Sequence, residues 1–200
     1  MDRLIKGYQR FRQETWPAAR ARYEALAQGQ SPQTLVIACS DSRVDPATVF
    51  GAGPGELFVV RNVAGLVPPY APDAGYHGTS AALEYAVRVL KVARIVVLGH
   101  AQCGGVRAMV EGAPAEARDF VEPWMQLAAA ALPAQAGEKT ENALTACEER
   151  VVRLSLDNLM TFPWIVDAVK EGRLELAGFR FDIHSGVLSR LEGDGFAPVS

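Results

Sequence analysis

The chain has 200 residues, 49% of them hydrophobic and 22% charged, which is enough to fill one core and shows no compositional break that would mark a second domain. Its net charge of -3 and scattered arginines exclude a basic surface for nucleic acid. No apolar run approaches the roughly 18 residues of a membrane span, and the N-terminus lacks the apolar core of a signal peptide. We therefore expect a single cytoplasmic domain over residues 1–200.

Residues 1–30 predict an N-terminal helical arm. Leu4, Tyr8 and Phe11 recur at helical spacing and form an apolar stripe on one or two amphipathic helices, which we expect to break at Pro17. Gly29 then ends the segment as a helix-stopping residue does. The arm either packs on its own domain or docks on a second subunit, and the sequence leaves both interpretations open.

Three short apolar runs predict strands that are buried on both faces of a parallel sheet. They cover residues 35–38, 57–60 and 95–98. Residues 79–89 have apolar side chains on one helical face, which predicts a crossover helix between the second and third strands. This alternation indicates an α/β fold with a central, mostly parallel sheet of four to five strands flanked by helices.

The C-terminal half predicts further helices and a last hairpin. Residues 116–160 are rich in Ala and Leu and are expected to be helical, with interruptions near Pro133 and Gly137. Pro163 begins another short helix. Residues 174–191 alternate well enough to form a hairpin at the edge of the sheet.

Two of the predicted strands carry metal-binding side chains at their carboxyl ends. Cys39 follows the first strand, and His100 ends the third strand with Cys103 three residues later. Functional groups gather at this end of an open parallel sheet. Two thiolates and an imidazole suit Zn²⁺, and three protein ligands leave a fourth position for water or substrate. The pattern therefore predicts a catalytic zinc site.

A carboxylate and a guanidinium follow the first thiol. Asp41, paired with Arg43, would stay ionised and accept a hydrogen bond from a hydroxide on the zinc. If Asp41 bound the zinc itself, all four positions would be filled and the enzyme would be off. The spacing argues against a phosphatase loop, because such a loop has five residues between Cys and Arg, whereas three separate Cys39 from Arg43.

Three motifs resemble the signatures of the β-class carbonic anhydrases, in their plant-type branch. The motifs are Cys39-Ser40-Asp41-Ser42-Arg43 with Pro46, Asn62-Val63-Ala64-Gly65, and His100-Ala101-Gln102-Cys103-Gly104-Gly105. The resemblance covers residues 29–191. It implies a lyase that hydrates carbon dioxide reversibly to bicarbonate and a proton through zinc-bound hydroxide.

The resemblance also implies a role for individual residues. The equivalents of Cys39, His100 and Cys103 hold one zinc per subunit in that family, and the equivalents of Asp41 and Arg43 form a catalytic dyad. In some members the aspartate becomes a fourth zinc ligand in a closed state. The residues that match the carbon dioxide pocket are Gln30, Phe58, Val63, Tyr85 and Gly104.

Members of the family are dimers or larger, which implies a homodimer or homotetramer with pocket residues from both subunits. Exposed aromatic side chains on the arm would favour aggregation of a monomer.

Two alternative functions remain open. The first is a hydrolase of carbon disulfide or carbonyl sulfide on the same fold. The second is an inactive zinc-binding module, against which the intact Asp41 and Arg43 argue. His77 is expected to be a surface residue, with a role as a proton relay as the alternative. Cys147 is expected to be a core thiol.

Overall fold

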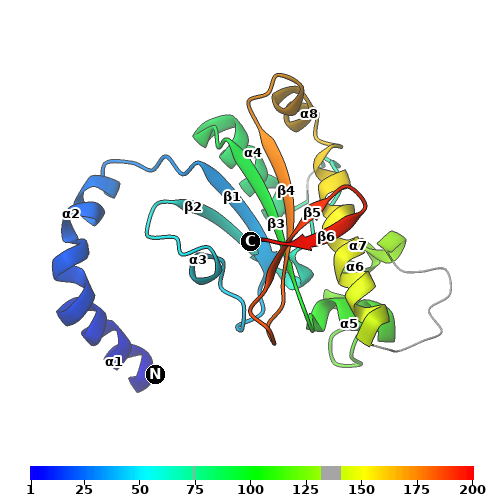
Figure 1. Cartoon of the computed structure of the whole chain (residues 1–200), viewed down its shortest axis with the longest axis horizontal. Helices are drawn as coiled ribbons and strands as arrows, with labels where there is room; N and C mark the ends of the chain where they lie inside the picture. Colours follow the sequence, from blue (N-terminus) through cyan, green and yellow to red (C-terminus); the bar gives the residue numbers. More distant parts are fainter. Residues whose placement is uncertain (74, 132–140) are drawn as a thin grey trace.

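A six-stranded sheet with the order β2-β1-β3-β4-β5-β6 forms the centre of the computed structural model, which describes residues 1–73, 75–131 and 141–200 (Figure 1). Strands β1 to β4 run parallel, and β5 and β6 continue the sheet in antiparallel pairing. The strands are β1 (Thr34–Cys39), β2 (Leu57–Asn62), β3 (Arg94–His100), β4 (Glu175–Phe181), β5 (Leu188–Glu192) and β6 (Gly195–Pro198). The mostly parallel α/β sheet is thus confirmed.

The predicted strand number of four to five is too low by at least one strand. The expected hairpin exists as β4 and β5, but the chain turns once more into β6. Only four residues make up β6, and they include Gly195 and Pro198. Glycine and proline are depleted in strands, so the local sequence gives little sign that this segment pairs.

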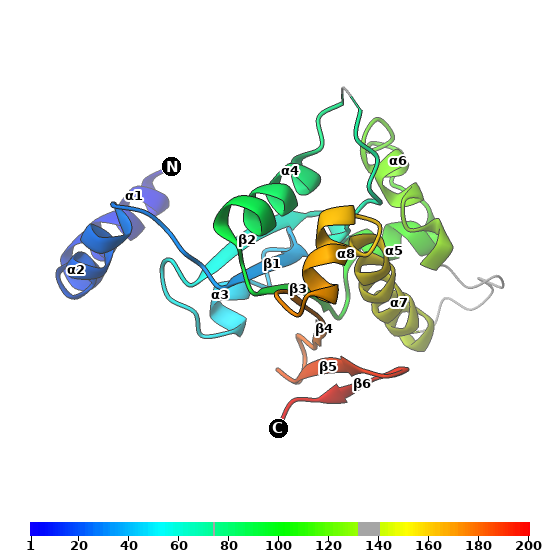
Figure 2. The same ribbon diagram turned by 90° about the horizontal axis from the view of Figure 1, so that it is seen from above.

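Helices cover the sheet unequally. Residues of β1 and β3 that point to one side, such as Ile37 and Val97, pack with the main helices in the largest core cluster. Their neighbours on the other side, such as Val36 and Val96, pack near the short helix α3. The helices are α3 (Pro46–Val49), α4 (Gly78–Glu84), α5 (Gly104–Glu111), α6 (Val121–Gln126), α7 (Glu141–Leu159) and α8 (Pro163–Lys170). Figure 2 shows α4, α7 and α8 on one side of the sheet and α3 on the other.

Shorter helical turns complete the chain. The crossover predicted over residues 79–89 is α4 followed by a π-helical segment, η3 (Tyr85–Leu90). Two 3₁₀ turns are η2 (Val63–Gly65) and η4 (Ala129–Ala131). Pro133 and Gly137, where helix interruptions were expected, lie outside the described residues. Within the described residues, none of the helices has the length and apolar character needed to cross a membrane.

The N-terminal arm is continuous, so the predicted break at Pro17 is wrong. Helix α1 (Asp2–Arg10), the π-helical segment η1 (Phe11–Thr15) and α2 (Trp16–Leu26) follow one another directly. Pro17 lies in the first turn of α2, where the N–H that proline lacks is least needed. The wider turn of η1 precedes it and carries the helix through.

The arm projects from the domain instead of packing along it (Figure 1). None of its helical residues is buried, and the side chains of Leu4 and Tyr8 are among its exposed apolar groups. Arg22 links its C-terminal part to the domain, where it binds Glu56 at 2.6 Å and the carbonyl of Pro54 at 2.8 Å. The domain of the same chain therefore leaves the apolar stripe of the arm uncovered.

Candidate metal centre

The carboxyl ends of β1 and β3 bring two thiols and an imidazole together. Cys39 ends β1 and His100 ends the adjacent β3, while Cys103 occupies the position just before α5. One donor atom from each residue lies within 4.8 Å of the others, and all three residues are buried. The two sulfur atoms are 3.8 Å apart. The predicted ligand triad is thus assembled within a single chain.

His100 has the orientation that a metal ligand needs. Its Nδ1 lies 2.9 Å from the carbonyl oxygen of Ala101. Because a carbonyl only accepts hydrogen bonds, Nδ1 carries the proton and Nε2 presents a lone pair. This Nε2 is buried and has no hydrogen-bond partner among the described residues. A buried polar atom of this kind requires a partner, and a metal between Nε2 and the two sulfurs would supply it.

The two thiols share a hydrogen bond. A hydrogen bond from Cys103 lowers the pKa of Cys39, even though burial opposes the thiolate. The same hydrogen bond, together with burial, raises the pKa of Cys103, although the N–H groups of Val106 and Gly105 favour its thiolate. The thiol of Cys39 therefore loses its proton easily, whereas the thiol of Cys103 keeps its proton. A cation at this position would stabilise both thiolates, which is a further reason that the site fits a metal.

Asp41 and Arg43 form a fork beside the triad. Arg43 donates from Nε to Oδ1 of Asp41 at 2.9 Å and from Nη2 to Oδ2 at 2.7 Å. The same Nη2 also donates to the carbonyl of Gln102 at 2.9 Å, so the guanidinium joins the loop after β1 to the loop after β3. These bonds hold the pKa of Asp41 well below its usual range. Oδ2 of Asp41 lies 3.9 Å from Nε2 of His100.

The Asn62-Val63-Ala64-Gly65 segment packs against both thiol-bearing loops. Gly65 has a φ of +64°, and a Cβ there would lie 3.1 Å from the backbone carbon of Ala38 and 3.2 Å from the nitrogen of Cys39. A Cβ on Gly105 would lie 2.9 Å from the Cβ of Ala64. Asn62 holds the turn by exchanging two 2.8 Å hydrogen bonds with the backbone of Leu66. The glycines are therefore needed for close approach at this end of the sheet.

The predicted substrate residues fall into two separate groups. Gly104 follows Cys103 directly, and Val63 lies against the start of α5, where a Cβ on Gly105 would be 2.9 Å from Val63 Cγ1. Gln30, Phe58 and Tyr85 form the second group. Phe58 is distant from the triad of the same chain, because it is in register with Leu35, four residues before Cys39 on β1. That spacing corresponds to about 13 Å along a strand.

The distant group is nevertheless a cluster. The rings of Phe58 and Tyr85 have centroids 6.0 Å apart. Tyr85 and Gln30 line one cavity of about 540 Å³, whose wall also includes residues of α2 such as Tyr23 and Leu26. The structure therefore brings Gln30, Phe58 and Tyr85 together near the base of the arm, and not around the metal ligands of their own chain.

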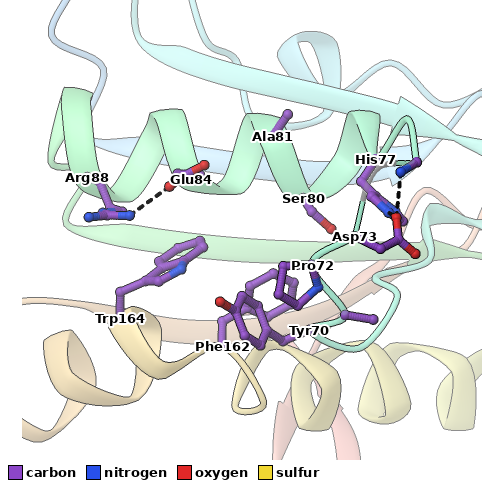
Figure 3. Close-up of a pocket in the computed structure, with 12 residues that line it drawn as sticks. Tyr70, Pro72, Asp73, His77, Ser80, Ala81, Glu84, Arg88, Phe162 and Trp164 are labelled. Atoms are coloured by element: carbon purple, nitrogen blue, oxygen red, sulfur yellow. Dashed lines mark hydrogen bonds and ion pairs between the residues drawn. The ribbon is translucent and has the colours of Figure 1, made fainter.

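His77 belongs to a different part of the surface. It pairs with Asp73 at 2.7 Å on the wall of a cavity of about 320 Å³ between α4 and the start of α8. Figure 3 shows the two side chains pointing toward each other, with Phe162 and Trp164 on the opposite wall. None of the three metal-binding residues lines this cavity. The relay role of His77 stays an untested prediction.

Sequence reasoning missed a buried ion pair behind the ligand triad. Glu148 on α7 accepts a hydrogen bond from the backbone N–H of Cys103 at 3.2 Å and forms an ion pair with Arg180 on β4. Glu148 follows Cys147, which is buried as predicted. No signal in the sequence singled it out, because a charged residue beside a core residue is ordinary in an amphipathic helix; only its burial, which a charge tolerates when it is paired, marks it.

Comparisons with known proteins agree on one family. A family model described as carbonic anhydrase matches residues 34–188. A carbonic anhydrase of Pseudomonas aeruginosa is 41% identical over 196 residues, which cover 96% of this chain and 88% of that protein. The solved structure of the beta-carbonic anhydrase CcaA is 32% identical with a TM-score of 0.93, covering 100% of this chain and 92% of that one. One of two tetrameric beta-carbonic anhydrases from Sordaria macrospora is 30% identical with a TM-score of 0.75, covering 100% of this chain and 95% of the other.

Proposed function

The chain belongs to the β-carbonic anhydrase family, and we propose that it hydrates carbon dioxide reversibly to bicarbonate and a proton at a zinc ion held by Cys39, His100 and Cys103. One observation carries the metal assignment. The buried Nε2 of His100 lacks a protein partner among the described residues and lies beside two sulfur atoms. A nitrogen and two sulfurs match the preference of Zn²⁺ and leave one tetrahedral position open.

When bound, zinc supplies a Lewis acid that lowers the pKa of water, so that water can attack carbon dioxide near neutral pH. Asp41 would orient the attacking water by accepting a hydrogen bond at Oδ2, which lies 3.9 Å from Nε2 of His100. Arg43 keeps that carboxylate in place and lowers its pKa. Because so weak a base does not retain a proton near neutral pH, Asp41 positions the water and leaves the released proton to solvent.

We propose that the substrate pocket is completed by a second subunit. Val63 and Gly104 would form the part of the wall supplied by the same chain as the zinc. Phe58 is in register with Leu35, about 13 Å along the sheet from Cys39 of the same chain, and Tyr85 and Gln30 lie with it at that end. They form an aromatic and amide cluster beside an arm whose apolar stripe is uncovered. In the proposed two-fold arrangement, this cluster would lie on the neighbour's site.

The assembly would be a homodimer or homotetramer. The uncovered apolar side chains of the arm support it, because apolar surface of this kind usually marks an interface. Similarity to a tetrameric relative also supports it. A cytoplasmic location would suit the site, since two sulfurs 3.8 Å apart must stay reduced to bind metal.

The decisive test is stopped-flow hydration of carbon dioxide by zinc-loaded protein, with metal content measured on the same sample. We expect turnover with one zinc per subunit. Carbonyl sulfide and carbon disulfide are assayed in parallel. Fully zinc-loaded protein that turns over either sulfur compound but not carbon dioxide would replace the proposal by the hydrolase, and protein without any turnover would reduce it to a zinc-binding module.

A further inference from the structure

We propose that Glu148 and Arg180 are positioning residues that fix the third metal ligand, Cys103, through its backbone. This inference rests on the proposed metal site and extends it to two residues outside the motifs. It starts from the backbone N–H of Cys103, which donates to Oε1 of Glu148 at 3.2 Å in a buried contact. Cys103 precedes the first residue of α5 and uses no side-chain cap of its own, so this N–H would otherwise lack a partner in that helix.

The two oxygens of Glu148 serve different partners. Oε1 faces Cys103, whereas Oε2 accepts from Nε of Arg180 at 3.0 Å and from Nη2 at 2.8 Å. The side chain of Glu148 is only 2% exposed and that of Arg180 12%. A charge pair so deeply buried is costly to desolvate, and apolar side chains of similar volume often stabilise a fold as well or better. Its presence beside a ligand is more simply explained by positioning than by stability.

The packing of α7 is built to bring Glu148 to this place. Val152 lies one turn after Glu148 on the same helix face and rests against two glycines on neighbouring strands. A Cβ on Gly99 would lie 2.6 Å from Val152, and one on Gly178 would lie 2.9 Å from it. Any larger residue at either position would push α7 away from the sheet. The glycines therefore set the distance over which Glu148 reaches Cys103.

Arg180 is directed to the same side of the sheet. It is in register with Gly99, so the two residues point toward the same face, and Gly99 adds no side chain there. The next pair in that register is His100 and Phe181. Strand β4 thus adjoins the imidazole ligand, and through Arg180 and Glu148 it also holds the backbone of the second thiol ligand. Movement of Cys103 away from His100 would break this chain of contacts.

The acceptor role predicts how substitutions behave. Cys103 and Arg180 bind different oxygens of Glu148, and in Glu148→Gln one of these positions becomes an NH2 group, which donates and cannot accept, so either Arg180 or Cys103 loses its acceptor. Removing the competing donor in Glu148→Gln/Arg180→Met leaves the amide oxygen free for Cys103. Glu148→Leu/Arg180→Met fills the same space without any acceptor. The two double variants therefore carry the same apolar replacement of Arg180 and differ in the hydrogen bond to Cys103.

The experiment measures zinc affinity by competition with a chelator, on protein shown by circular dichroism to be folded. We expect Glu148→Leu/Arg180→Met to bind zinc about 10- to 100-fold more weakly than the natural chain, although it is at least as resistant to urea. Glu148→Gln/Arg180→Met should regain most of the affinity. Substitution of cobalt for zinc gives a second readout, since the thiolate-to-cobalt absorption should change only in the variant without the acceptor.

Ser155→Ala is the matched control. Ser155 is on the same helix, is fully buried and accepts a hydrogen bond from the backbone N–H of Val67 at 3.2 Å. Its loss should lower stability and leave zinc affinity unchanged. Natural affinity in Glu148→Leu/Arg180→Met, or equal affinities in the two double variants, would overturn the positioning role. Cys103→Ala separates this failure from that of the metal site: if it keeps its zinc, the proposed site itself is wrong.

Discussion

The two ends of the parallel sheet differ in how complete they are within one chain. At the carboxyl end, Cys39, His100 and Cys103 are buried and surrounded by paired groups. At the amino end, Phe58, Tyr85 and Gln30 stand beside an arm that has no buried helical residue. Among the described residues, the buried side-chain atom without a partner at the first end is Nε2 of His100, which a metal would satisfy, whereas the second end exposes apolar surface that the proposed second subunit would cover. The difference suggests that metal binding is a property of the subunit and catalysis a property of the assembly.

Removal of one ligand should have the largest effect and act on the carboxyl end alone. Cys103→Ala leaves two ligands, so stoichiometric zinc and carbon dioxide hydration should both be lost. Oligomer size, measured by light scattering, should stay as in the natural chain because the arm is untouched. Full zinc content in this variant would contradict the ligand assignment. Dissociation of the assembly would contradict the independence of the two ends.

Asp41→Asn should lower kcat by about 10²-fold, the usual cost of a misplaced reactant, while zinc stays bound. The amide keeps the shape of the carboxylate but lacks the charge that binds Arg43 through two side-chain contacts. Asp45→Asn is the matched control, because Asp45 is four residues away, where it caps α3 through Thr48 and lies 3.9 Å from Arg61. Zinc analysis and stopped-flow rates on both variants make the measurement. Equal rates in the two variants would show that the Asp41–Arg43 pair is not needed.

Deletion of residues 1–20 tests the amino end. The deletion removes Leu4, Tyr8, Phe11 and Trp16, but it spares the ligands and Arg22, which links the arm to the domain. We expect smaller particles in light scattering and a loss of most of the hydration activity, with zinc content unchanged. A fully active monomer would show that the pocket does not depend on a second subunit.

Residues at the carboxyl end differ in how far the sequence could predict them. The ligands follow short apolar strands at a fixed spacing, and sheet topology alone brings strand ends together. That part of the site is therefore local in the sequence. Glu148 could not be found in this way, because it lies 45 residues from Cys103 and reaches it only through the packing of α7 on Gly99 and Gly178.

The errors of the fold prediction have a similar origin. A proline in a helical segment usually breaks it, but Pro17 falls where α2 begins after a π-helical segment. The strand β6 pairs only because β5 is already in place beside it. In both cases the outcome depends on neighbouring structure and not on the propensity of the residue.

The smallest expected effect concerns Asp45, which lies near the carboxyl end without serving the metal. Its Oδ2 accepts from the N–H of Thr48 at 2.9 Å and from the Thr48 hydroxyl at 2.8 Å, capping α3. These bonds lower its pKa below the ordinary value. A group with a lowered folded pKa stabilises the fold above its unfolded pKa, and this contribution is lost as the pH falls through the folded pKa.

Asp45→Ala should therefore lower the free energy of unfolding by about 1 kcal/mol at neutral pH, the usual value for loss of an N-cap. The difference from the natural chain should shrink as the pH is lowered below the ordinary aspartate range. The measurement is urea unfolding of both metal-free proteins at a series of pH values. Metal-free protein is used because zinc would dissociate at low pH and add a second pH dependence to the stability. Zinc affinity at neutral pH should be the same in both proteins. A fall in affinity would mean that α3 helps to hold Cys39, so that the structure supporting the metal ligands at the carboxyl end includes α3.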